Sequence, residues 1–83
     1  MARHERTLEA IFRNPVPADI QWRAMVSLLR HLGASIDEGA GSRVGFTLNG
    51  RRAVFHRPHP GKELKRGAVR DLREFLRSAG VER

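Results

Sequence analysis

Residues 41–60 read GSRVGFTLNGRRAVFHRPHP, and this stretch decides how the chain folds. Two runs of alternating apolar and polar residues flank the dipeptide Asn49-Gly50. Both residues of a two-residue β-hairpin loop need positive φ, which Asn and Gly tolerate best. The stretch therefore predicts a β-hairpin whose loop is Asn49 and Gly50.

This loop also fixes the pairing of the two strands, because a slip of one residue would turn both apolar sets away from the core. The guanidinium of Arg43 is then expected beside the imidazole of His56, on the face that stays in water. The apolar face is expected to hold the pairs Leu48–Arg51, Phe46–Ala53 and Val44–Phe55, and the opposite face the pairs Thr47–Arg52, Gly45–Val54 and Arg43–His56.

Apolar spacing predicts three helices and one more strand around the hairpin. We expect helices near residues 5–13, 21–32 and 65–79, and strands near 34–37, 43–49 and 51–56. The first helix is amphipathic, so it should lie over an otherwise exposed part of the core. Prolines at 15 and 17 end it. Trp22 opens the apolar stripe of the second helix and is interpreted as a core residue, with ligand stacking as the alternative.

The order of these elements predicts an α+β fold. Three strands in sequence should form an antiparallel sheet, and the last two helices supply apolar stripes to cover one of its faces, giving a two-layer sandwich. Without the first helix, the order α-β-β-β-α is that of a double-stranded-RNA-binding domain (dsRBD). We therefore divide the chain into residues 1–17, an N-terminal helix and linker, and residues 18–83, the dsRBD-like domain.

The charge balance indicates a polyanionic partner. Sixteen Lys and Arg face nine Asp and Glu, a formal charge of +7, and only two of the sixteen are Lys. The planar guanidinium suits phosphate better than a point charge does, so RNA, DNA or an acidic protein are candidates, with ordinary solubility charge as the alternative. Cysteine is absent and no segment is long and apolar enough to span a membrane or act as a signal peptide. We expect a cytoplasmic protein.

The last predicted helix carries a regular stripe of arginines. Arg66, Arg70, Arg73 and Arg77 follow one another at intervals of four, three and four residues, so they share one helical face. This stripe is either a ridge that faces a nucleic acid or a solvated surface.

The hairpin and the loop after it resemble a known family. The residues Gly41-Ser42, the hairpin and the run HRPHPGKELKRGAVR at 56–70 are similar to the HicA toxins of type II toxin–antitoxin systems, and the similarity covers roughly residues 22–81. It implies a dsRBD-like ribonuclease that acts on messenger RNA (mRNA) and is blocked by a HicB antitoxin. The family's catalytic histidine typically follows the Gly-Ser pair, where this chain has Arg43 and Val44.

Metal-free RNA cleavage needs a base, an acid and a cation for the phosphorane, and the hairpin offers substitutes for the missing histidine. We expect His56 to act as base or acid, Arg43 to hold the phosphate, and His59 to be a second candidate, against the alternative that both histidines are merely exposed. Two histidines are too few for a zinc site, so neither a metal nor a cofactor is expected. Candidate RNA-binding residues are Ser42, Arg51, Arg52, Arg57, Lys62, Lys65, Arg66, Arg70, Arg73 and Arg77.

Three functions remain open on these residues. The first is a metal-independent endoribonuclease toxin whose partners are mRNA and a HicB-like antitoxin. The second is an RNA-binding domain that has lost catalysis with the family histidine, and the third is a module that mainly binds the antitoxin.

Overall fold

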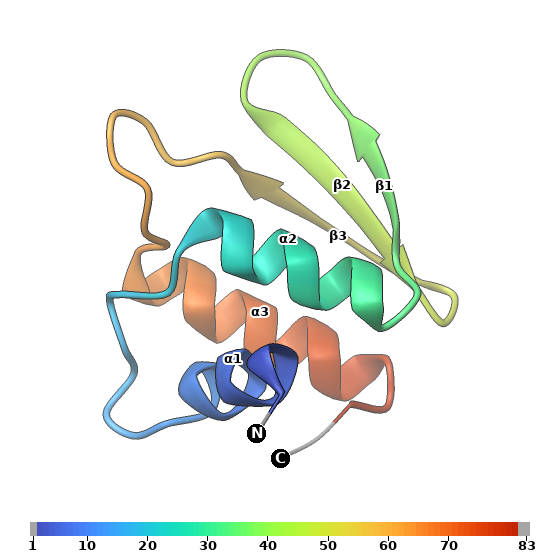
Figure 1. The fold of residues 1–83 in the computed structure, drawn as a ribbon. Coiled ribbons are helices and arrows are strands. Elements are labelled where there is room, and N and C mark those ends of the chain that lie inside the picture. Colours follow the sequence, from blue (N-terminus) through green and yellow to red (C-terminus); the bar gives the residue numbers. More distant parts are fainter. Residues whose placement is uncertain (1, 82–83) are drawn as a thin grey trace.

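The computed structural model describes residues 2–81 and shows three helices and three strands within them. Helices α2 and α3 lie side by side against one face of the sheet, and α1 packs across these two helices on the side away from the strands (Figure 1). The predicted α+β sandwich with its extra N-terminal helix is confirmed. The elements are α1 (Arg3–Ile11), α2 (Trp22–His31), β1 (Ser35–Glu38), β2 (Arg43–Leu48), β3 (Arg51–His56) and α3 (Arg66–Ser78).

The sheet is antiparallel in the order β1-β2-β3, and its hairpin has the predicted register. All six predicted pairs between β2 and β3 are present, from Leu48–Arg51 beside the turn to Arg43–His56 at the far end. Asn49 has φ 51° and Gly50 has φ 80°, the left-handed conformation that this turn requires. The local sequence is therefore sufficient to set the pairing.

One face of the sheet is buried and the other is open. Val44, Phe46, Leu48 and Phe55 are at most 4% exposed and pack toward the helices. Val54 on the opposite face is 46% exposed, and the charged residues beside it on that face are exposed as well. The alternation in the sequence thus separates a packing face from a face available to a partner.

Helix α1 is part of the hydrophobic core. Ile11 is fully buried and belongs to the same cluster as residues of α2, α3 and the sheet, with Leu8, Ala10 and Phe12 packed against it. The predicted cover over the core is confirmed, although the helix begins and ends two residues earlier than expected. Its end at Ile11 leaves a short non-helical lead into Pro15 and Pro17, whose rings disfavour helix in the residues before them.

The loop that follows β3 is tied to the start of α2. The backbone N–H of Trp22 donates to the carbonyl oxygen of Lys62 at 2.8 Å, and the N–H of Leu64 donates to the carbonyl oxygen of Ile20 at the same distance. Leu64 is itself 2% exposed. These contacts hold residues 57–65 against the sandwich, so the side chains of this loop have defined places.

Candidate functional site

Arg43 and His56 lie side by side on the open face of the sheet. They are directly paired across β2 and β3, at the end of the hairpin farthest from its turn, and both are exposed. Side chains that are directly opposite in an antiparallel pair have their Cβ atoms about 4.5–5.5 Å apart. The predicted pairing of these two residues across the strands is confirmed.

His56 and His59 line one groove of about 490 Å³ between the end of β3, the loop at 57–65 and the first turns of α3. Arg57, Lys65 and Asp71 also line this groove, so it offers cations and a carboxylate beside two imidazoles. An imidazole can donate or accept a proton near neutral pH, and both of these are open to solvent. The structure therefore brings the second candidate histidine to the same concave surface as the first.

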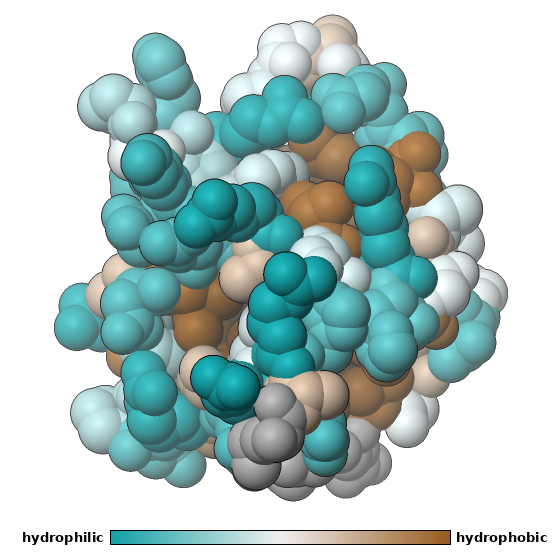
Figure 2. Space-filling view, in the orientation of Figure 1, coloured by the Kyte–Doolittle hydropathy of each residue, from teal (hydrophilic) through white to brown (hydrophobic). Residues whose placement is uncertain are grey.

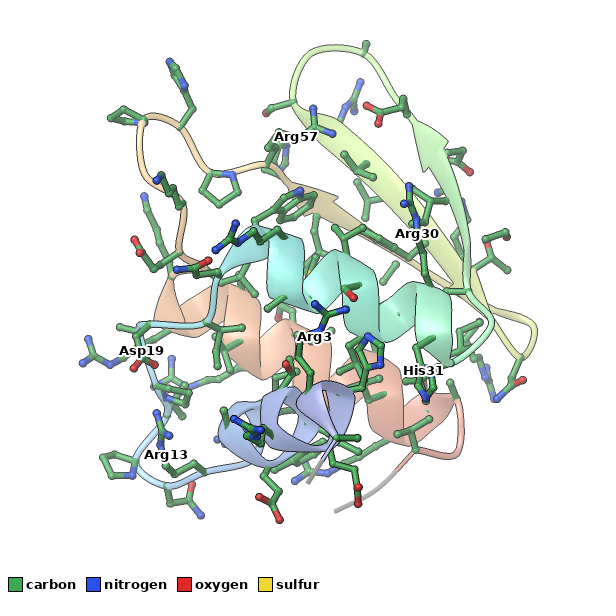
Figure 3. All side chains as sticks on the ribbon, viewed as in Figure 1. Arg3, Arg13, Asp19, Arg30, His31 and Arg57 are labelled. Atoms are coloured by element: carbon green, nitrogen blue, oxygen red, sulfur yellow. The ribbon has the colours of Figure 1, made fainter. Side chains whose placement is uncertain are left out.

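Arg57 closes the end of the sandwich between the sheet and α2, as Figure 3 shows. Its guanidinium lies 3.2 Å from a carboxylate oxygen of Glu38 and 5.9 Å from the ring centroid of Trp22. Its backbone N–H donates to the carbonyl oxygen of Ser42 at 2.8 Å, which continues the pairing of β2 and β3 beyond the last strand residues. Arg57 and Ser42 are thus placed next to the Arg43–His56 pair.

Arg52 forms an ion pair across the open face of the sheet. Its guanidinium lies 3.0 Å from a carboxylate oxygen of Asp37 on β1, and the pair crosses over Gly45, where a Cβ atom would collide with both partners. Gly45 is buried by this pair even though it lies on the open face. Its missing side chain is what allows the two charges to meet.

The remaining predicted RNA contacts are distributed over two places. Lys65 lines the histidine groove, and Lys62 lies on the other side of the same loop. Arg51 stands beside the hairpin turn, at the opposite end of β3 from His56. At a rise of about 3.3 Å per residue these two residues of β3 are roughly 16 Å apart, so the structure does not bring Arg51 to the site.

The arginine stripe of α3 is not simply a free ridge or a solvated surface, because three of its four members contact the N-terminal segment. Arg73 donates to the carbonyl oxygens of Ile11 and Arg13, and Arg66 donates to that of Val16 at 3.2 Å. The guanidinium of Arg77 lies 5.2 Å from the ring centroid of Phe12. The last member, Arg70, has no such contact with the N-terminal segment within residues 2–81.

Trp22 packs against the hydrophobic core, as its position in the apolar stripe predicts, but it lies at the edge of that core. One edge of its indole packs against Phe46, with ring centroids 6.0 Å apart, but the residue is only partly buried. It also lines two hollows on the surface. Apolar spacing does not indicate this exposure, because the stripe of α2 looks the same whether its first turn is covered or open.

The described part of the chain, residues 2–81, has no group of three or more His, Cys, Asp or Glu side chains that could hold a metal ion. None of its helices is long and apolar enough to cross a membrane.

Comparison with known proteins gives one match. The model of the family described as HicA toxin of bacterial toxin–antitoxin matches residues 22–81, from the first turn of α2 onward. No curated protein and no solved structure matches the chain. The family match covers well over half of the 83 residues and leaves α1 outside it. With the helix and strand order already described, this match shows that the chain belongs to the HicA family, the toxins of bacterial toxin–antitoxin systems.

Proposed function

We propose that this toxin acts on mRNA in the cytoplasm, cleaves it without a metal ion, and is neutralised by a HicB-type antitoxin. The family match supports a toxin of a toxin–antitoxin system, and the formal charge of +7 supports a polyanionic target. The observation that carries the catalytic part is the Arg43–His56 pair on the open face of the sheet.

The pair offers two of the three functions that RNA cleavage needs. His56 takes the proton of the 2′-hydroxyl as this oxygen attacks the adjacent phosphorus, and Arg43 stabilises the negative charge of the phosphorane. The 5′-oxygen leaves with a proton from an acid, and the products are a 2′,3′-cyclic phosphate and a 5′-hydroxyl. His59 lines the same groove as His56 and is the candidate for this acid.

RNA would be held mainly around this pair. Ser42, Arg57, Lys62 and Lys65 lie on the neighbouring sheet end and loop, and Arg52 lines a hollow on the open face together with Arg43. A phosphate could replace the exposed carboxylate partners of Arg52 and Arg57. Arg51 and Arg70 are farther contacts. Arg66, Arg73 and Arg77 primarily hold the N-terminal segment, so we place them outside the main RNA surface.

A second candidate function has a specific observation in its favour. Arg43 and Val44 stand where the family's catalytic histidine is expected, and an arginine cannot replace a histidine as a proton donor and acceptor at neutral pH. The alternative is an inactive module that binds RNA or the antitoxin. It predicts salt-dependent RNA binding without cleavage, because neutralised phosphates release counterions.

The deciding experiment incubates the purified protein with a long mRNA, with and without a chelator, and compares it with the His56→Ala and Arg43→Ala variants. We expect cleavage in chelator and a loss of about 100-fold or more in His56→Ala, the range for removal of a general acid or base. RNA affinity should stay within about threefold. His31→Ala is the control for loss of a histidine, because His31 is exposed and lies at the end of α2 away from the proposed site; its ring stacks on His4, so thermal unfolding of the variant is measured as well.

Each result separates the two candidates. Unchanged cleavage in His56→Ala would remove this residue from the mechanism, and binding without cleavage by the unaltered protein would favour the inactive module. Growth arrest on induced expression, relieved by an antitoxin gene encoded beside it, would test the toxin–antitoxin pairing.

A further inference from the structure

A second concave surface lies across the loop from the histidine groove, and Trp22 forms its floor. One hollow of about 240 Å³ is lined by Trp22, Pro58 and their neighbours, and a second hollow continues along α2 on the other side of the indole. Figure 2 shows hydrophilic side chains over most of this side of the molecule, with hydrophobic side chains in hollows between them. We call the two hollows together the Trp22 platform. Its lining residues are Gln21, Trp22, Arg23, Val26, Ser27, Arg30, Arg57, Pro58, Gly61 and Lys62.

The charged side chains that line the platform are all positive, although one of them, Arg57, is paired with Glu38 outside the lining. Arg23, Arg30, Arg57 and Lys62 line it, and no Asp or Glu does. Arg57 already has its guanidinium over the indole, at 5.9 Å from the ring centroid. Arg23 donates a hydrogen bond to the neutral side chain of Gln21 at 2.9 Å, so its charge is not cancelled there. A flat aromatic surface ringed by cations suits a ligand that is flat and aromatic at one end and anionic at the other.

The platform is continuous with the proposed cleavage site. The platform and the histidine groove lie on opposite sides of the loop, and Arg57, Pro58 and Gly61 line both of them. The backbone N–H of Trp22 donates to the carbonyl oxygen of Lys62, which holds the first turn of α2 against this loop. A single RNA strand that crosses this loop would therefore pass both the platform and the histidine groove.

We propose that the Trp22 platform binds one unpaired nucleotide of the RNA, with the base stacked on the exposed indole and the flanking phosphates near Arg23 and Lys62. This inference rests on the proposed function and adds to it a preference for single-stranded RNA next to the cleaved bond. A base within a duplex is already stacked on its neighbours and cannot present its face to the indole. A protein that offered only acidic side chains would pair with the cations but would have no group to stack on the indole.

The chain contains one tryptophan, so its fluorescence reports on this platform alone. We would titrate the protein with a short single-stranded RNA, an oligonucleotide of equal length that lacks its bases, an RNA duplex and an acidic peptide. We expect quenching of Trp22 by the single strand and little change with the other three, because stacking needs an accessible base.

Two variants test the contacts separately. Trp22→Leu keeps an apolar side chain over Phe46 but removes the stacking surface, and should weaken binding of the single strand by at least about fivefold, whereas Trp22→Phe should weaken it less. Arg23→Gln should reduce the salt dependence of binding by about one unit of slope, with Arg13→Gln as the control for loss of one charge elsewhere. Thermal unfolding of each variant excludes loss of the fold, and if Trp22→Leu fails to fold, the fluorescence of the unaltered protein and the Arg23→Gln slope decide.

The outcomes separate this inference from the function on which it rests. Single-stranded RNA that binds without quenching Trp22, and with equal affinity in Trp22→Leu, would overturn the inference and leave the proposed function standing. Equal quenching by the acidic peptide or the baseless oligonucleotide would also overturn it. No binding of any RNA at low salt would instead refute the proposed function.

Discussion

Two groups of arginines in this molecule share a residue type and differ in what surrounds them. Arg66 and Arg73 on α3 donate to main-chain carbonyl oxygens of the N-terminal segment. Arg52 and Arg57 beside the sheet meet carboxylates that are more than 60% exposed. If Arg66 or Arg73 turned to a phosphate, main-chain oxygens of the N-terminal segment would lose their donor. If Arg52 or Arg57 did so, only an exposed carboxylate would be released to water. Only the second group is therefore suited to a ligand.

The difference arises where α1 ends. The carbonyl oxygens of the last helical turn have no donor within the helix, and the prolines at 15 and 17 prevent the chain from continuing as a helix that would supply one. Arg73 satisfies the oxygens of Ile11 and Arg13 from another element. The arginine stripe of α3 thus serves the extra helix that lies outside the family match. Net charge alone would therefore overstate the size of the proposed RNA-binding surface.

The largest effect that tests this comparison is expected from Arg73→Met. The change keeps an apolar stem and removes the donors to Ile11 and Arg13, leaving two carbonyl oxygens without that partner. Hydrogen bonds from a charged group contribute about 1.5–3 kcal/mol, so we expect the free energy of unfolding to fall by about 2 kcal/mol. Urea unfolding followed by circular dichroism measures it.

Arg70→Met is the matched control, because Arg70 lies in the same stripe, is exposed, and has no side-chain hydrogen bond or ion pair within residues 2–81. Its effect on stability should be within about 0.5 kcal/mol. Equal losses in both variants would show that the stripe stabilises the protein by general charge and not through the N-terminal segment.

The same contrast explains what could be predicted from the sequence. The hairpin register follows from neighbours in the chain, an Asn-Gly turn and alternating residues, so the placing of Arg43 beside His56 could be derived before any coordinates. The partners of Arg73 are about 60 residues away in the sequence. Helical periodicity shows that a stripe exists, but it carries no information on which segment covers it.

The same limit applies to the candidate site. His59 reaches the same groove as His56 only through the path of the loop, which is fixed by hydrogen bonds to the residues before α2. Trp22 belongs to the apolar stripe of α2, but this stripe does not show how closely the loop at 57–65 covers the first turn of the helix. Local turn residues and alternation predict the strands and their pairing. They do not predict surfaces that form between segments distant in the sequence.

A smaller effect is expected at the ion pair between Arg52 and Asp37. Both side chains are more than half exposed, so their attraction is screened by water and the pair should contribute less than about 1 kcal/mol. We expect Asp37→Asn to lower the free energy of unfolding by that amount at most and to raise RNA affinity, since it frees Arg52 and removes a negative charge.

A double-mutant cycle of Asp37→Asn with Arg52→Gln isolates the coupling between the two side chains. A coupling as large as the loss in Arg73→Met would contradict the comparison, because the exposed pair would then be as fixed as the contacts of α3. RNA affinity measured at low salt provides the second readout. A lower affinity in Asp37→Asn would show that RNA binding needs Arg52 held by Asp37, and not a free Arg52.

The smallest effect concerns the other end of α1, where two histidines hold it to α2. The imidazoles of His4 and His31 stack with centroids 4.3 Å apart, and the Nε2 of His4 lies 2.8 Å from the Oγ of Ser27. Figure 3 shows His31 at the end of α2 nearest to α1. Burial lowers the pKa of His4 below its ordinary value of 6.5, and the nearby charges of His31 and Arg3 lower it further.

A lowered pKa means that the unfolded chain binds the proton of His4 more readily than the folded chain does. This contribution to stability is present above pH 6.5 and is lost as the pH falls through 6.5 toward the lower folded value. We expect urea unfolding at pH 7.5 and pH 5.5 to show a small loss at the lower pH that His4→Gln reduces. Arg73→Met should keep the same pH dependence, because it loosens the opposite end of the segment. If Arg73→Met abolished it, the two attachments of α1 would be one cooperative unit, and the N-terminal segment would be released as a whole when either end is lost.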